Sequence, residues 1–137
     1  MSLRLRGDGF DPALVESELG LCPKWIGIKG QPRIDKDGRE WAPHTTNFWT
    51  HQVPLQPECG FDQQIQYLFE KLGDRVERVR ELCSRVDVEG ELFCGFGREA
   101  GRSGGDIIAP STLRLLVDAG LSLSLDLYPP KLPRPNA

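Results

Sequence analysis

The sequence predicts an α+β fold with two layers, in which helices cover one face of a mixed, mostly antiparallel sheet of about five strands. Two observations support this prediction. Some segments alternate apolar and polar residues, as strands with one face in water do, and others repeat apolar residues at helical spacing. The 137 residues suit one domain, expected over 1–128, with a proline-rich tail over 129–137. An elaborated ferredoxin-like arrangement is one candidate within this class.

The first strand and the first helix follow directly from the N-terminus. Leu3 and Leu5 alternate with arginines, which predicts a half-buried strand. Asp11 can then cap a short helix over about residues 11–19. Proline at the next position suits the first helical turn, and Gly20 suits the left-handed residue that ends a helix.

Two strands are expected in the tryptophan-rich segment that follows. One lies near residues 25–29 and the other near 46–53. Between them, "DKDG" at residues 35–38 predicts a turn, because its glycine can take a positive φ angle. Three residues of the second strand share one face: Trp49, His51 and Val53.

The middle of the chain predicts two helices in tandem, or one helix kinked at Gly73. The first apolar stripe comprises Ile65, Leu68, Phe69 and Leu72. The second comprises Val76, Val79, Leu82 and Cys83. Asp62 can cap the start of the first helix, and Asp74 with Glu77 resembles a capping box for the second.

Two further strands and one helix are expected in the last third of the chain. The segment from residue 86 has an apolar face of Val86, Val88, Leu92, Cys94 and Phe96, and an acidic face of Asp87, Glu89 and Glu91. A solvated sheet face is the favoured interpretation of these carboxylates, over a cation site or a surface for a basic partner. A helix should begin at Pro110 and end at Gly120, with Leu113, Leu116 and Val117 toward the core. In the final strand, "LSLSLDLY", the leucines should face the core and Ser122, Ser124 and Asp126 the other side.

The glycine-rich stretch "CGFGREAGRSGGDIIAP", residues 94–110, raises the question of a phosphate site. Gly95, Gly97 and Ala100 fit a dinucleotide-binding fingerprint. Such a loop works because its helix starts at the glycines and points its first amides at the pyrophosphate. Here the next helix starts only at Pro110. We therefore interpret residues 95–105 as a connection, with a rim around a binding surface as a limited alternative.

Composition argues against several classes of protein. A net charge of -3 gives no broad electrostatic reason to bind nucleic acid or a membrane surface. No apolar run reaches membrane-spanning length, and the N-terminus lacks the apolar core of a secretory signal. The cysteines show no CxxC spacing and, with the two histidines, match no familiar metal set. We therefore expect reduced thiols, a cytoplasmic location, and neither a metal nor another cofactor.

Two hypotheses for function remain. No nucleophile–base pair can be argued, so we assign no catalytic residue and favour a non-catalytic module that binds a protein partner, in its strongest form an immunity- or antitoxin-like protein. The chain could be a monomer or a homodimer, since an edge strand needs covering. The alternative is a small-molecule or anion-binding sensor or enzyme, with a site formed by Trp25, Lys29, Arg33 and Asp126. Trp49 is a further binding candidate, although we favour a position in the core for it. For Trp25 and Trp41, neither the core nor the surface is favoured.

Several of these segments occur together in a known family. "FDPALVESELGLCPKWIGIKGQPR", "NFWTHQV" and "IAPSTLRLLVDAGLSLSLDLY" come in the order of the bacterial domain of unknown function 4279 family, which the chain resembles over nearly its whole length. The matching residues are Asp11, Pro12, Leu19, Gly20, Pro23, Trp25, Lys29, Gly30, Trp49, Gly120, Asp126 and Tyr128. Ala109 departs from the family, in which a capping serine or threonine is common. The resemblance implies a small bacterial cytoplasmic protein and supplies no catalytic residue; similar small domains often serve as antitoxin-like or regulatory binding partners.

Overall fold

The computed structural model describes residues 1–54, 59–96 and 106–127. The proline-rich tail and the glycine-rich segment 97–105 lie outside the described residues. In chain order the elements are β1 (Ser2–Gly7), α1 (Pro12–Leu19), β2 (Trp25–Gly27), β3 (Arg33–Ile34), β4 (Glu40–Trp41), β5 (Asn47–Gln52), α2 (Phe61–Leu72), a 3-10 turn (Gly73–Arg75), α3 (Val76–Ser84), β6 (Glu89–Phe96), α4 (Pro110–Ala119) and β7 (Ser122–Leu127).

Five strands form one mixed sheet in the order β2-β5-β1-β6-β7. Neighbouring strands run antiparallel, apart from the parallel pair β6 and β7. The elements from β1 to β6, without the small β3–β4 hairpin, follow the β-α-β-β-α-β order of a ferredoxin-like fold. Helix α4 and strand β7 add one parallel strand at the β6 edge. The predicted α+β class, the mostly antiparallel sheet and its elaborated ferredoxin-like form are confirmed.

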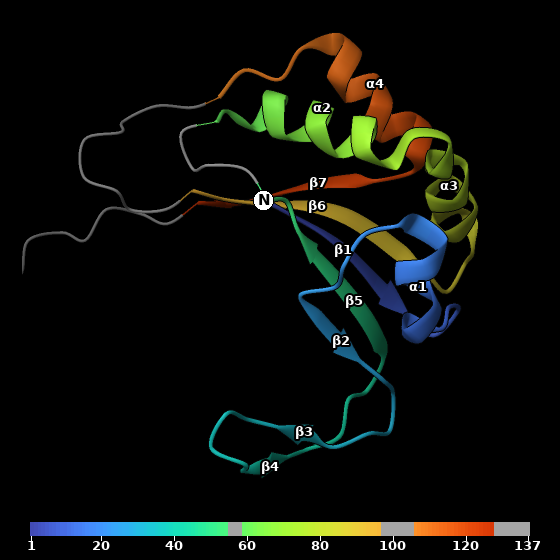
Figure 1. The fold of residues 1–137 in the computed structure, drawn as a ribbon, viewed down its shortest axis with the longest axis vertical. Coiled ribbons are helices and arrows are strands. Elements are labelled where there is room, and N and C mark those ends of the chain that lie inside the picture. The colour runs from blue at the N-terminus through green and yellow to red at the C-terminus, as the bar shows by residue number, and fades with distance from the viewer. Residues whose placement is uncertain (55–58, 97–105, 128–137) are drawn as a thin grey trace, which may run out of the picture.

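The helices lie on one face of the sheet, as predicted (Figure 1). Helices α2 and α4 lie beside the β6 and β7 end, and α3 and α1 continue the layer toward β1 and β5 (Figure 1). The β3–β4 hairpin projects from the β2 and β5 end on the side away from the helices (Figure 1). One face of the sheet is therefore packed, and the other is uncovered within the described residues.

The core fills the space between the sheet and the helices. From the sheet, Leu3, Leu5, Trp49 and Leu92 are at most 1% exposed. The two predicted helical stripes meet them, with Ile65, Leu68, Phe69, Leu72, Val79 and Leu82 buried. Val76 and Cys83 are partly buried and pack against this core. Gly90 of β6 allows α3 to approach the sheet, because a Cβ there would lie 2.4 Å from the Cys83 sulfur.

The ends of the helices show where local sequence signals hold and where they fail. Helix α1 begins and ends as predicted, with Asp11 accepting a hydrogen bond from the Ala13 amide at 3.0 Å and Gly20 at a φ of 68°. The predicted cap at Asp62 is wrong, because the Phe61 amide at the start of α2 donates to Asp106 Oδ2 at 2.5 Å. Asp62 instead accepts from the Ala109 amide, before α4, at 2.8 Å.

These two aspartates cap across space rather than along the chain. The start of α2 and the segment before α4 lie close enough for each aspartate to bond an amide of the other, which sequence spacing does not reveal. The predicted capping box at Asp74 is also wrong: Asp74 lies in the 3-10 turn, and no side chain caps α3. The turn begins at Gly73, which has a φ of 55° and separates the two helices as expected.

Four further expectations need correction, concerning two strand boundaries and the apolar residues that are covered. Strand β2 ends at Gly27, two residues early, and β6 begins at Glu89, which leaves Val86 in a turn and 99% exposed. Helix α4 buries Thr112, Leu116 and Ala119, whereas Leu113 and Val117 are 41% and 75% exposed. Leu125 of β7 is 51% exposed. The reason is position, since β7 is an edge strand and α4 packs on its inner side against α2 and α3.

Candidate functional site

The candidate functional site is the face of the five-stranded sheet that the described helices leave uncovered, which we call the open face. Register places its side chains in rows across the strands. One row crosses all five strands and comprises Ser122, Glu91, Arg4, Thr50 and Trp25. The rows on either side comprise Ser124, Phe93, Ser2 and Gln52, and Glu89, Arg6 and Phe48. A hollow of about 770 Å³ lies over this face.

An aromatic patch occupies the β2–β5 side of the open face. Trp25 is 61% exposed and lies diagonally across from Phe48 on the neighbouring strand. The Phe48 ring covers Gly27, where an added Cβ would lie 1.9 Å from the ring, so glycine is required beneath it. The His44 ring packs edge-on against Phe48, with 5.1 Å between the centroids. The patch therefore combines a supported phenylalanine with a tryptophan that is free to contact a partner.

Charged side chains cross the middle of the open face. Arg4 lies 3.7 Å from Glu91, and Arg6 lies 3.9 Å from Glu89. The Arg4 guanidinium also lies 3.6 Å from the centroid of the Phe93 ring. Solvent-exposed ion pairs at such distances contribute little to stability. Both arginines can therefore exchange these contacts for those of a partner at small cost.

The charge on the open face is divided between its two halves. Arg4, Arg6 and Lys24 line the hollow on the side of β1, β5 and β2. The acidic residues that line it, Glu89 and Glu91, lie on β6. The half that carries Trp25 is thus basic and aromatic, and the other half is acidic.

The structure does not bring together the four residues of the predicted anion site. Trp25 is in β2 and Asp126 in β7, at opposite edges of the sheet, and four strand spacings separate them by about 19 Å. Lys29 Nζ already pairs with Asp8 at 2.7 Å. Arg33 lies in the separate β3–β4 sheet and donates through Nε to the Ala42 carbonyl at 2.9 Å. The expectation that these residues converge was wrong because the strand order could not be derived from the sequence.

The tryptophans have three different positions. Trp49 faces the helices and is fully buried in the core, which confirms the favoured expectation. Trp41 of the hairpin is 50% exposed, and its Nε1 donates to Asp35 Oδ2 at 3.0 Å. Of the predicted site residues, Trp25 and Asp126 have side chains on the open face, but at its opposite edges. Sequence reasoning missed Arg4, Arg6 and Phe93, although an aromatic residue at an outward strand position was an available signal.

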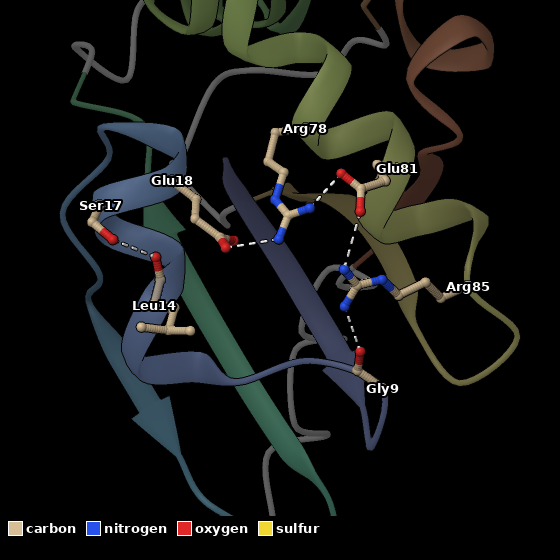
Figure 2. Close-up of polar contacts among 7 residues, drawn as sticks. All are labelled: Gly9, Leu14, Ser17, Glu18, Arg78, Glu81 and Arg85. Carbon is tan, nitrogen blue, oxygen red and sulfur yellow. Dashed lines mark hydrogen bonds and ion pairs between the residues drawn. The ribbon is translucent and has the colours of Figure 1, made fainter.

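A second hollow, of about 610 Å³, lies between α1 and α3 beside a network of ion pairs (Figure 2). Arg78 bonds Glu18 at 2.7 Å and also bonds Glu81. Arg85 donates to Glu81 at 3.2 Å and to the Gly9 carbonyl at 2.7 Å (Figure 2). Hydrogen bonds from Arg78 and Arg85 lower the pKa of Glu81. These guanidinium groups are already engaged within the chain, so we assign this network to holding α1 against α3.

Within the described residues, no group of three or more histidine, cysteine, aspartate and glutamate side chains could hold a metal ion. His51 Nδ1 instead lies 2.7 Å from the Cys22 carbonyl oxygen. The four cysteines are free thiols, and Cys94 is buried as expected.

Comparison with known proteins supplies the family. A family model described as a domain of unknown function, DUF4279, matches residues 1–130. The chain belongs to the DUF4279 family. No curated protein and no solved structure matches it. In this DUF4279 chain, none of the described helices is long and apolar enough to cross a membrane. DUF4279 is defined without a function, so the open face is the feature of this chain that points to one.

Proposed function

We propose that this DUF4279 chain is a non-catalytic module of the bacterial cytoplasm that binds a protein partner through the open face, in the manner of an immunity protein or antitoxin. The observation that supports this proposal is Trp25, a tryptophan 61% exposed on the same uncovered sheet face as Arg4 and Arg6, two strands away. Tryptophan and arginine are enriched among the residues that contribute most to binding between proteins.

The two halves of the open face favour a partner of defined chemistry. The aromatic patch of Trp25 and Phe48 offers apolar area, and Arg4 and Arg6 offer planar donors that suit carboxylates. A partner that presents an apolar side chain flanked by aspartate or glutamate fits this half. Carboxylates of the partner would replace Glu89 and Glu91 as the ion-pair partners of the arginines. Binding should therefore weaken as the salt concentration is raised, because salt screens exposed charges.

A direct test compares variants against one purified partner. The chain would be used to capture proteins from a bacterial lysate of its host, and the captured protein would be purified and titrated by calorimetry. Trp25→Ala and Arg4→Glu should each weaken Kd by about thirtyfold, because truncating a central interface residue costs about 2 kcal/mol or more. Leu14→Ala is the matched control, since Leu14 is 52% exposed on α1, on the helix side of the sheet.

Circular dichroism would establish that each variant is folded. An unchanged Kd for Trp25→Ala would contradict the proposal, as would a lysate that yields no protein above background. Loss of binding in Leu14→Ala, with binding kept in Trp25→Ala, would place the interface on the helix face instead.

A further inference from the structure

The two edges of the five-stranded sheet differ in how well they are protected against pairing with another strand. Strand β2 is only three residues long. Short length is one of the features with which proteins block an edge. Strand β7 is six residues long, has no proline, lysine or arginine, and within the described residues pairs with β6 alone. Such an edge is a template for a further strand.

Exposed apolar side chains gather beside the same edge. Leu113 and Val117, one helical turn apart on α4, are 41% and 75% exposed, and Leu125 of β7 is 51% exposed. A crossover helix lies over the two strands that it connects, here β6 and β7. In a right-handed crossover, the flank of α4 that carries Leu113 and Val117 is turned toward the free edge, away from α2 and α3. The unpaired backbone and the uncovered apolar surface are thus adjacent.

We propose that β7 pairs with β7 of a second copy of this chain, in antiparallel orientation about a two-fold axis at Ser124. This register sets Leu123 opposite Leu125 of the copy on the helix side. On the open face it sets Ser122 opposite Asp126, so that no like charges face each other. The two sheets then form one continuous sheet, and the interface is isologous, as a two-fold dimer requires.

The helices fit the same axis. Strands lie about 4.8 Å apart, so α4 and its copy, each over its own pair of strands, lie about 9.6 Å apart, within the range of packed helices. Gly120 and Leu121 turn α4 directly into β7, which places Ala119 and Ser122 at nearly the same level. Measured along the strand from that level, Ser124 lies two residues, or about 6 Å, further on. Four residues of the antiparallel helix cover the same distance. The axis at Ser124 therefore passes near position 115 of α4, and Leu113 lies beside Val117 of the copy.

The test is the mass of the full chain in solution. Sedimentation at up to about 100 µM, which populates a dimer with a micromolar Kd, should show a dimer for the unmodified chain. Leu125→Lys and Val117→Lys should each weaken the dimer at least tenfold. Val86→Lys is the matched control: Val86 is 99% exposed in the turn before β6, and the dimer should remain.

A second measurement addresses the register and does not depend on a disruptive variant. In Ser124→Cys, a short bismaleimide should join position 124 of one copy to position 124 of the other, as identified by peptide mapping. A monomer at every concentration would overturn the proposal. A dimer that both lysine variants leave intact, or one whose cross-links join position 124 to other cysteines but never to itself, would overturn it as well. None of these results depends on a protein partner for the open face.

Discussion

Trp49 shows how one residue combines large stabilisation with a local defect. It is fully buried on the helix face of β5, yet its Nε1 has no hydrogen-bond partner in the described part of the chain. A buried donor without a partner lowers stability by about 1–3 kcal/mol. The ring therefore stabilises the core through apolar area while its N–H group opposes that effect.

Replacing Trp49 by phenylalanine should consequently be mild. Trp49→Phe removes the unsatisfied donor together with part of the ring, and the two effects offset each other to within about 1 kcal/mol. Trp49→Ala leaves a cavity and should lower the free energy of unfolding by about 3–5 kcal/mol. Urea unfolding followed by far-ultraviolet circular dichroism measures both. A loss for Trp49→Phe as large as that for Trp49→Ala would contradict this expectation.

Among the elements, the β3–β4 hairpin gathers several hydrogen bonds on one side chain. The Asp35 carboxylate accepts hydrogen bonds from the Trp41 indole at 3.0 Å and from the amides of Asp37 and Arg39 at 2.9 Å each. The bond from Trp41, followed by that from the Arg39 amide, lowers the pKa of Asp35 from its ordinary 3.8. Because the hairpin is exposed and has little core of its own, this carboxylate determines the position of Trp41.

A pH titration should therefore loosen the hairpin. A carboxylate with a lowered pKa stabilises the folded form fully above its ordinary pKa, and this stabilisation is lost as pH falls through the folded pKa. The Trp41 indole N–H signal, followed by nuclear magnetic resonance, should shift as pH falls below 3.8.

Asp35→Asn should abolish that titration, whereas Asp37→Asn, which changes a side chain that makes no contact with Trp41, should leave it unchanged. The buried Trp49 signal reports whether the whole domain is still folded. A Trp41 signal that does not move while Trp49 stays native would contradict the assignment.

For the whole molecule, burial of cysteines offers a measure of cooperative unfolding. Cys94, in β6 between β1 and β7, is fully buried, and burial raises its pKa. Burial likewise raises the pKa of Cys83, on α3, to about 11. Cys22 is exposed. Both burial and a raised pKa slow alkylation, because the thiolate is the reactive form.

Alkylation by iodoacetamide, read by mass spectrometry, should thus modify Cys22 well before Cys83 and Cys94 in the native protein. The Cys94 rate should rise with urea in parallel with global unfolding, since residues at the centre of a domain open last. Fully denaturing urea should bring all the rates together, as a control. Rapid labelling of Cys94 without denaturant would instead show that the β6–β7 side opens locally.

Local signals sufficed for most elements of this fold. The alternation of Leu3 and Leu5, the apolar stripe from Ile65 to Leu72 and the left-handed Gly20 depend on neighbours a few residues away, so they can be read from the chain. The candidate site was less accessible. Arg4, Phe48 and Trp25 share one face only because β1, β5 and β2 lie in that order in the sheet, and strand order depends on long-range pairing.

The sequence by itself determined that this chain forms an α+β domain of the DUF4279 family, with a buried Trp49 and helices bounded by Gly20, Gly73 and Gly120. Only the tertiary structure decided that Trp25 lies on an uncovered sheet face while Asp126 lies at the far edge, and that Asp106 bonds the first amide of α2 while Asp62 bonds the amide just before α4. The reason is physical: periodicity reports whether a side chain faces the core, whereas the identity of the strand or helix beside it is set by the packing of the whole chain.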